Sequence, residues 1–469
     1  MSRRALTGMR WREHGPSVLV AALASAFGVT LLHLTGALDR VIRADDTTGS
    51  SGTVAVFLTL VAIVFIVISV YVSAVVTANT FATVIAGRTR SIARLRLIGA
   101  TASQQRRAVA REGLLVGAVG SLLGALAGTL VAWLIVTICV ATDLLPAISY
   151  SYLQPVLLLP IVAVVVTTWA ASWAGSRRVL VVSPLAAAGA AHDSSYEEAA
   201  GRRGRNAVAA TLAIIGGALL VIGVLIGLAS PLGVLVGLIG GVLSFTGVVI
   251  GAQRVMPPAL NLAGRLLGRS APARLAAQNA LRYPERAART TIGLVIGVTL
   301  VTMFAVVVET YAAILRAAQE AQPEVYQGVD TALAITVGVF SVLLGFSALI
   351  AAVGLVNNLS LSVLQRTREL GLLRALGFTA AQLRSLVRAE AAQLTIAALA
   401  TGFVLGILYG WAGAQSLLGI LAGGIVLPVV PWWLVLAVVA SGLLLTLVAS
   451  AVPARRATRV APVVALAVE

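Results

Sequence analysis

The chain is poor in the residue types on which soluble enzymes depend. Only 11% of its 469 residues are charged, whereas soluble domains carry roughly 25%. All 34 basic residues are Arg and none is Lys, which excludes a nucleotide-binding P-loop because that loop needs a Lys. The only cysteine, Cys139, excludes an intramolecular disulfide and a CxxC metal or redox site. The sequence contains no recognisable catalytic triad, haem site or metal-ligand cluster, so we expect no catalytic and no metal-binding residues.

What the chain has in abundance is apolar sequence. Hydrophobic residues make up 59% of it, and the mean hydropathy is +0.99. A helix needs about 20 apolar residues to cross a bilayer. These features predict an all-α polytopic membrane protein with about ten transmembrane helices. The ten candidate runs lie at roughly 17–38, 53–86, 113–141, 155–175, 207–228, 231–252, 292–312, 332–360, 391–417 and 432–452.

The net charge of +17 would suit a nucleic-acid partner, but the distribution of arginine argues against one. With the N-terminus inside, 31 of the 34 Arg fall in inner segments, and only Arg40, Arg43 and Arg316 fall in outer loops. Such a bias sets the orientation of a membrane protein. We therefore expect both termini to be cytoplasmic, no nucleic acid to be bound, and the anionic inner leaflet of the lipid bilayer to face the positive charge.

One cytoplasmic segment occurs twice, with an offset of 278 residues between Arg88 and Arg366. Twelve of the 25 residue pairs between 88–112 and 366–390 are identical, and no gap is needed. An ungapped match of this kind indicates an internal duplication. Six spans separate the starts of the two copies, and because six is even, the repeats are parallel rather than inverted. Two like cytoplasmic faces suit a two-fold symmetric partner.

The first apolar run follows four Arg residues, so a cleaved signal peptide is the alternative to a retained span. The run matches the seventh span under the same offset. Because that equivalent span is part of the mature protein, we expect the first run to be kept as a transmembrane span as well. Gly117, Gly120, Gly124 and Gly128 in the third span have the spacing that allows close helix packing.

The duplication divides the chain into three parts. Residues 1–190 form the first four-span repeat, and residues 279–469 form the second. Residues 191–278 hold a polar linker at 192–205, the fifth and sixth spans as a two-helix insert, and an amphipathic cytoplasmic helix.

The amphipathic helix is expected from Arg254 to Arg289, on the inner membrane surface. Its apolar residues Met256, Leu260, Ala263 and Leu267 fall at helical spacing. Pro257 and Pro258 would then lie in or before its first turn.

Residues 361–390 predict a helix–turn–helix elbow between the eighth and ninth spans. Gly377 can close one helix in a left-handed conformation, and Thr379 can cap the next, with Gln382 completing a capping box. An elbow joined end-on to two transmembrane helices can convert a push from a soluble partner into helix movement. The alternative is that its arginines only anchor the loop to the membrane, but the reuse of the turn in both copies favours coupling.

The stretch from Gln365 to Gly377, QRTRELGLLRALG, followed by Gln382 and Glu390, resembles the signature of FtsX-like (MacB-like) ABC transporter permeases. Residues 279–286 resemble the entry segment of that family's four-span unit, and 455–462 resemble its closing segment. The resemblance covers both repeats and implies the ten-span form, with two four-span units in one chain.

In that family the elbow contacts the ATPase subunits. The resemblance therefore implies ATPase-coupling residues in both copies, namely Arg88, Arg90, Arg96, Gly99, Arg366, Arg368, Glu369, Gly371, Arg374, Gly377 and Gln382. The first copy has Ser91 in place of the acid and Ala93 in place of the glycine, so its elbow is expected to couple less strongly. The outer loop at 313–331 is too short for the extracellular domain of larger family members.

The expected function is that of a permease subunit in a bacterial plasma (inner) membrane. A separate ABC ATPase, in two copies, would carry ATP and Mg; this chain would hold no cofactor and would not itself be an enzyme. The cargo implied by the resemblance is an amphipathic lipid, peptide or lipophilic drug. The alternative is mechanotransmission to a periplasmic or cell-wall partner without transport. An ion-coupled carrier is disfavoured by the parallel repeats and by the lack of buried acid pairs.

Glu309 is the one acid inside a predicted span, which makes it a candidate for the substrate path. The alternative, which we prefer, is that Glu309 lies at the outer interface, about one turn from water.

Overall fold

The computed structural model describes residues 11–44, scattered positions between 59 and 79, 101–142, 145–152, 154–181, 203–267, 271–282, 284–322, 338, 345, 349 and 376–459. These ranges contain helices, turns and irregular loops, and no strand. The chain divides into two compact units. Unit 1 is Met1–Ala191 with Asp330–Val353, and unit 2 is His192–Val329 with Gly354–Glu469.

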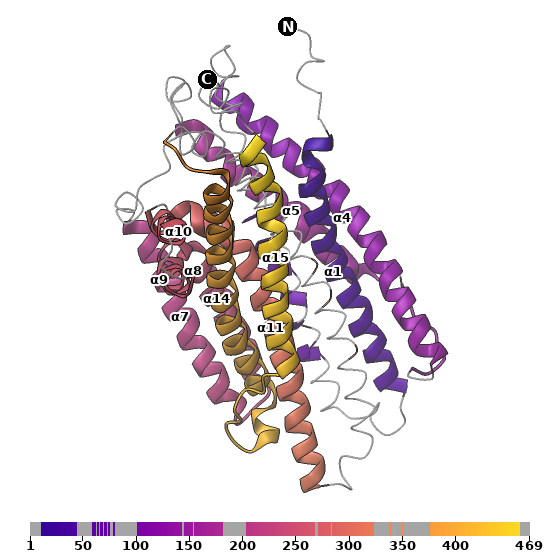
Figure 1. The fold of residues 1–469 in the computed structure, drawn as a ribbon. Helices are drawn as coiled ribbons and strands as arrows, with labels where there is room; N and C mark the ends of the chain where they lie inside the picture. The colour runs from indigo at the N-terminus through magenta and orange to yellow at the C-terminus, as the bar shows by residue number, and fades with distance from the viewer. Residues whose placement is uncertain are drawn as a thin grey trace. The chain divides into compact units, whose positions relative to one another are not determined.

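Unit 1 is built around one long helix. That helix, α4 (Ala102–Ala141), packs along one side on α1 (Trp11–Ala44) and along another on α5 (Leu158–Val181), which follows the single-turn helix η2 (Pro155–Leu157). Figure 1 shows α1 and α4 running side by side. The α4 helix therefore forms the centre of the described part of unit 1.

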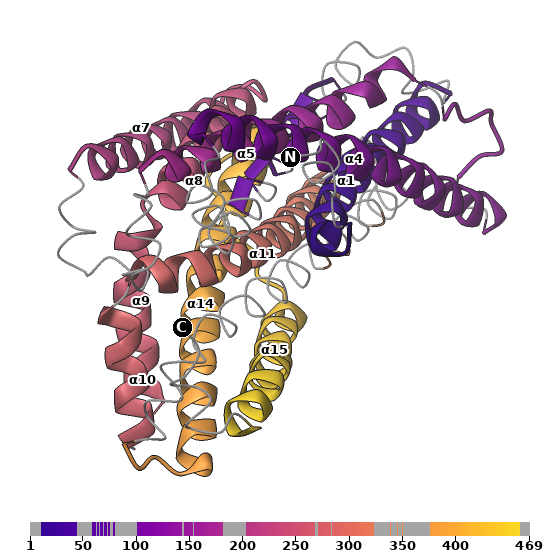
Figure 2. The same cartoon turned by 90° about the horizontal axis from the view of Figure 1, so that it is seen from above.

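Unit 2 is arranged in the same way around α14 (Ala380–Ala422), which packs on every other described helix of the unit (Figures 1 and 2). Those helices are α7 (Arg203–Gly227), α8 (Gly233–Ile250), α9 (Ala252–Leu266), α10 (Ala271–Arg282), α11 (Pro284–Ala321) and α15 (Trp432–Arg459).

Seven described helices are long and apolar enough to cross a membrane, which confirms an all-α polytopic membrane protein. The predicted spans at 53–86 and 332–360 lie mostly outside the described residues. The predicted tenth span is α15, whose apolar stretch is Trp432–Leu444. The seven helices cover Ser17–Val41, Ser103–Ala141, Pro155–Ala174, Gly204–Gly227, Gly233–Ile250, Thr291–Ala321 and Ala381–Ala422.

The two copies share a close helix contact at an equivalent pair of glycines. A Cβ atom on Gly128 of α4 would lie 2.7 Å from the carbonyl oxygen of Ala26 in α1. A Cβ atom on Gly406 of α14 would lie 2.8 Å from the carbonyl oxygen of Thr299 in α11. Small residues allow transmembrane backbones to approach in this way. The close packing predicted from the glycine spacing in the third span is therefore confirmed, and it recurs in the second copy.

The insert packs on the second copy, which the sequence did not indicate. The hydroxyls of Ser244 in α8 and Tyr409 in α14 are hydrogen-bonded at 2.8 Å, and Phe245 meets the edge of the Tyr409 ring. At the end of α7, a Cβ on Gly227 would lie 2.6 Å from the Cα of Ser416. The fifth and sixth spans thus cover one face of α14.

The prediction that Arg254 to Arg289 forms one continuous helix is wrong, whereas its place at the inner membrane surface stays a prediction. The segment forms two helices, α9 and α10, and then begins α11 at Pro284. Pro257 and Pro258 lie within α9, beyond its first turn. Three residues of the predicted apolar face, Met256, Leu260 and Ala263, are buried inside the protein, because α9 packs on α10, α11 and α14, and Leu267 is half-buried. Periodicity identifies residues that share a face, but not the surface that covers it.

Candidate functional site

The second elbow has the predicted turn. Gly377 has φ +95°, a left-handed conformation that favours glycine. Thr379 is the N-cap of α14, and its Oγ1 accepts a hydrogen bond from the Gln382 amide at 3.2 Å. The Gln382 Oε1 accepts from the Thr379 amide at 2.9 Å, which completes the capping box. The predicted first helix of the elbow lies outside the described residues.

An apolar contact fixes the entry of this elbow. Leu383 is fully buried, and Phe378 and Val387 pack against it. Phe378 immediately precedes the N-cap and Leu383 is the fourth helical residue, so the pair forms a hydrophobic staple. The staple sets the angle at which the chain enters α14, in addition to the polar cap.

The first elbow has the same capping box but lacks the hydrophobic staple. Thr101 and Gln104 form the same reciprocal capping box, with both bonds at 3.3 Å. The position equivalent to Leu383 is Gln105, so the staple pair is absent from the sequence. Instead, the Arg106 guanidinium lies 3.7 Å from the centre of the Trp173 ring in α5, a cation–π contact. The 278-residue offset places Ala451 opposite Trp173, so the second copy cannot make this contact.

The elbow end of α14 is held by the helices that follow the insert. Gln393 is fully buried, and its Nε2 donates to the carbonyl oxygen of Leu260 in α9 at 2.9 Å. Thr291 of α11 donates to the sulfur of Met256, also in α9, at 3.1 Å. The residue equivalent to Gln393 in the first copy is Leu115, which is 50% exposed. The helices that begin at the two elbows are therefore held by contacts with different neighbouring helices.

At the opposite end of unit 2, α14 holds the loop that follows it. The Trp411 Nε1 donates to the carbonyl oxygen of Val426 at 2.6 Å. Gln415 donates to the Gly424 carbonyl at 2.7 Å and accepts from the Val426 amide at 3.1 Å. We call residues 423–431 the loop end. The sequence analysis did not predict these hydrogen bonds between α14 and the loop end, although a glutamine inside an apolar run was a usable signal.

Glu309 lies near the loop end. It is half-buried on α11, and its neighbour Thr310 accepts a hydrogen bond from the Val429 amide at 3.1 Å. Its role in a substrate path stays a prediction. Among the described residues, no group of three or more His, Cys, Asp and Glu side chains could hold a metal ion.

Two of the predicted coupling residues lie in the described part of the chain. The structure brings Gly377 and Gln382 together in the second elbow. The others lie outside the described residues: Arg88, Arg90, Arg96, Gly99, Arg366, Arg368, Glu369, Gly371 and Arg374. Their contribution to coupling stays a prediction.

Comparison with known proteins gives two results. A family model described as "FtsX-like permease C-terminal" matches residues 63–184 and 341–462, which together make up more than half of the chain. The two matches are offset by the same 278 residues as the repeat, and both capped turns fall inside them.

A curated relative is the "Uncharacterized ABC transporter permease YknZ" of Bacillus subtilis (strain 168), which is 30% identical over 146 residues. The match covers 31% of this chain and 35% of the relative. The chain thus spans about a third of the length of that relative. Taken with the duplicated family match, the helical membrane architecture and the repeated capped turn, these results show that the chain belongs to the FtsX-like family of ABC transporter permeases and contains that family's domain twice.

Proposed function

We propose that this chain is the membrane subunit of a bacterial inner-membrane transporter, in which a separate ABC ATPase drives extraction or export of an amphipathic lipid, peptide or lipophilic drug. The observation that carries the proposal is the occurrence of one capped turn, with the same Thr and Gln, in both family-matched segments. Two like turns offer two like docking points, which suits two copies of the ATPase. ATP and Mg bind to that partner, because this chain has no Lys for a P-loop.

The helices behind the turns are suited to carry movement across the membrane. The α4 helix has 40 residues and α14 has 43. At 1.5 Å per residue, each is about 60 Å long, which exceeds the thickness of a bilayer. A displacement at the Gly377–Thr379 turn therefore moves α14 along its whole length, including Trp411 and Gln415, which hold the loop end. Both termini and both elbows lie on the cytoplasmic side in this scheme.

The proposal is tested by reconstitution. The chain is purified together with a candidate ABC ATPase from the same organism and placed in vesicles that contain a fluorescent lipid, an amphipathic peptide or a lipophilic dye. ATP-dependent movement of one of these compounds is the expected result, and the isolated chain should hydrolyse no ATP. Robust hydrolysis by the isolated chain, with contaminants excluded, would contradict the assignment of ATP to a partner.

The same experiment separates the alternatives. ATP hydrolysis that depends on both subunits but moves none of the compounds favours mechanotransmission to a periplasmic or cell-wall partner. Movement that needs no ATP and stops when an ionophore collapses the ion gradient would identify an ion-coupled carrier and overturn the proposal.

A further inference from the structure

The α9 helix presents three distinct faces. Ala252, Met256, Leu260, Ala263 and Gly264 form the buried face. A second face is apolar and exposed: Val255, Leu262 and Leu266 are 38%, 61% and 71% exposed. At 100° per residue these three fall within about 40° of one another, so they form a narrow stripe along the helix.

The third face is basic. Arg254 and Arg265 are both exposed, and their separation of 11 residues places them on the same side of α9, about 16 Å apart along its axis. The chain has no Asp or Glu between Glu198 and Glu285. Neither guanidinium makes an ion pair with a residue that the structure describes. Within the described part of the chain, the charge of the basic face is therefore not neutralised.

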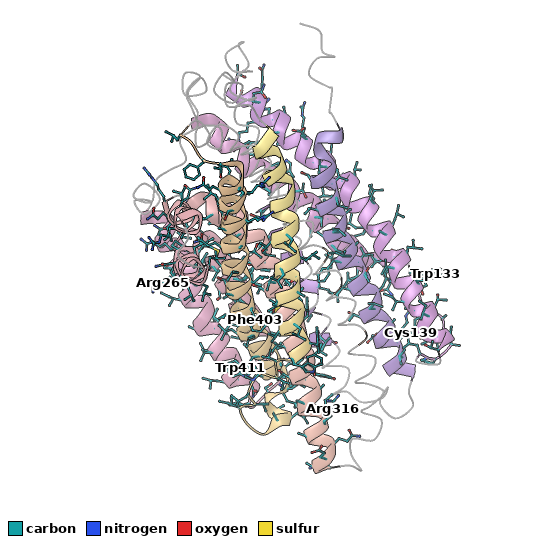
Figure 3. The ribbon with its side chains drawn as sticks, in the orientation of Figure 1. Trp133, Cys139, Arg265, Arg316, Phe403 and Trp411 are labelled. Carbon is teal, nitrogen blue, oxygen red and sulfur yellow. The ribbon has the colours of Figure 1, made fainter. Side chains whose placement is uncertain are left out.

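The α9 helix continues into α10 along one side of α14. Figure 1 views α9 and α10 nearly end-on, and Figure 2, turned by 90°, shows them lengthwise beside α14. Figure 3 places Arg265 at α9, well away from Arg316 near the far end of α11. A helix with an exposed apolar stripe beside a basic face has the features of a helix at a membrane surface.

We propose that α9 is a binding site for anionic phospholipid in the leaflet on the elbow side. Arg254 and Arg265 pair with the lipid phosphates, and the stripe of Val255, Leu262 and Leu266 enters the acyl-chain region. The buried face of α9 is unavailable to lipid, because it contacts α11 and α14. Through the hydrogen bond from Gln393 to Leu260, the bound lipid also supports the helix that carries the second elbow.

The experiment reads lipid contact at α9 itself, because the many other arginines would dominate a bulk lipid-binding assay. A Leu262→Cys variant in a Cys139→Ala background is labelled with a small fluorophore. The full chain is placed in membranes of equal phosphatidylglycerol and phosphatidylcholine, with brominated acyl chains on one lipid or the other. Leu443→Cys on α15, which is also exposed and apolar, serves as the matched probe position.

We expect brominated phosphatidylglycerol to quench the Leu262 probe more than brominated phosphatidylcholine does, and the two lipids to quench the Leu443 probe equally. Each arginine should raise the local preference roughly fivefold at low salt. The preference should therefore disappear in Arg254→Gln/Arg265→Gln and persist in Arg316→Gln, the matched loss of one exposed arginine at the far end of α11.

Two results would overturn the proposal. If neither lipid quenches the Leu262 probe, the stripe is not in the membrane. If the two lipids quench it equally when both arginines are present, the basic face does not select anionic lipid, and this comparison decides the matter even if the double variant fails to fold. ATPase binding is not measured, so a negative result leaves the proposed function untouched.

Discussion

The capping box of the second elbow allows a quantitative prediction. Thr379→Ala removes the hydroxyl that accepts from the Gln382 amide at 3.2 Å, while the Thr379 carbonyl can still accept from Leu383 at 3.0 Å. Loss of an N-cap threonine costs about 1 kcal/mol, with a range of roughly 0.5–2 kcal/mol. If the first turn of α14 opens locally, 1 kcal/mol corresponds to roughly fivefold faster amide exchange there.

Hydrogen exchange measured by mass spectrometry on the purified full chain tests this prediction. Peptides covering 376–390 should exchange faster in Thr379→Ala than in the native chain, and peptides from 101–112 should not change. Ser385→Ala is the matched control, because Ser385 is exposed in the same helix and makes no capping bond. Thr101→Ala should give the mirror result, with faster exchange confined to the first elbow.

Equal exchange in Thr379→Ala and Ser385→Ala would refute the claim that the cap stabilises the elbow. Gly377→Ala gives an independent check. At φ +95° an alanine is strained by roughly 1–2 kcal/mol. Its effect should therefore be similar in size to that of Thr379→Ala. If neither substitution changes exchange, the turn is not a stable element, and the coupling role assigned to it fails.

Three further predictions concern packing, topology and coupling. Gly406→Ala should lower the free energy of unfolding of the purified chain by about 1–3 kcal/mol, because the new Cβ would lie 2.8 Å from the Thr299 carbonyl oxygen. Gly413→Ala, whose Cβ would meet only Val307 at 3.8 Å, should leave this free energy unchanged. In a Cys139→Ala background, single cysteines introduced at Ser103, Ser195 and Thr379 should be shielded from an impermeant thiol reagent in intact cells. Cysteines introduced at Thr47 and Gln322 should react. Labelling of Thr379→Cys from outside would contradict the ten-span topology. Glu369→Ala or Arg374→Ala should uncouple ATP hydrolysis from transport more than Ser91→Ala or Arg96→Ala, since unpairing a partly buried charge at an interface costs roughly 2–5 kcal/mol; equal, small effects would favour simple membrane anchoring.

The features that sequence predicted correctly depend on local chemistry. A Thr three residues before a Gln, after a glycine, specifies a capped turn because the bonds join neighbouring residues. The glycine spacing in the third span predicted close helix packing, and the structure shows it at Gly128 and again at Gly406. Such signals need no knowledge of which other segment lies nearby.

The features that sequence missed depend on which helix covers which face. The spacing of Met256 and Leu260 correctly placed them on one face, but nothing local indicated that α11 and α14, rather than lipid, would cover it. Likewise, nothing in the sequence around Tyr409 indicates that it forms a hydrogen bond with Ser244, 165 residues away. In a membrane this ambiguity is general, because a lipid-facing and a protein-facing apolar surface have similar composition.

The supports of the two elbows suggest how a duplicated chain can become functionally unequal. Both copies keep the capping box, which sets the shape of the turn. The first elbow helix is held within its own repeat by Arg106 on Trp173. The second is held by Gln393 on α9, a helix that belongs to neither repeat. A movement of the second elbow must therefore carry α9 with it or break that hydrogen bond, whereas the first has no such attachment among the described residues. Two like docking points can thus receive the same push and respond differently, even before the differences at Ser91 and Ala93 are considered.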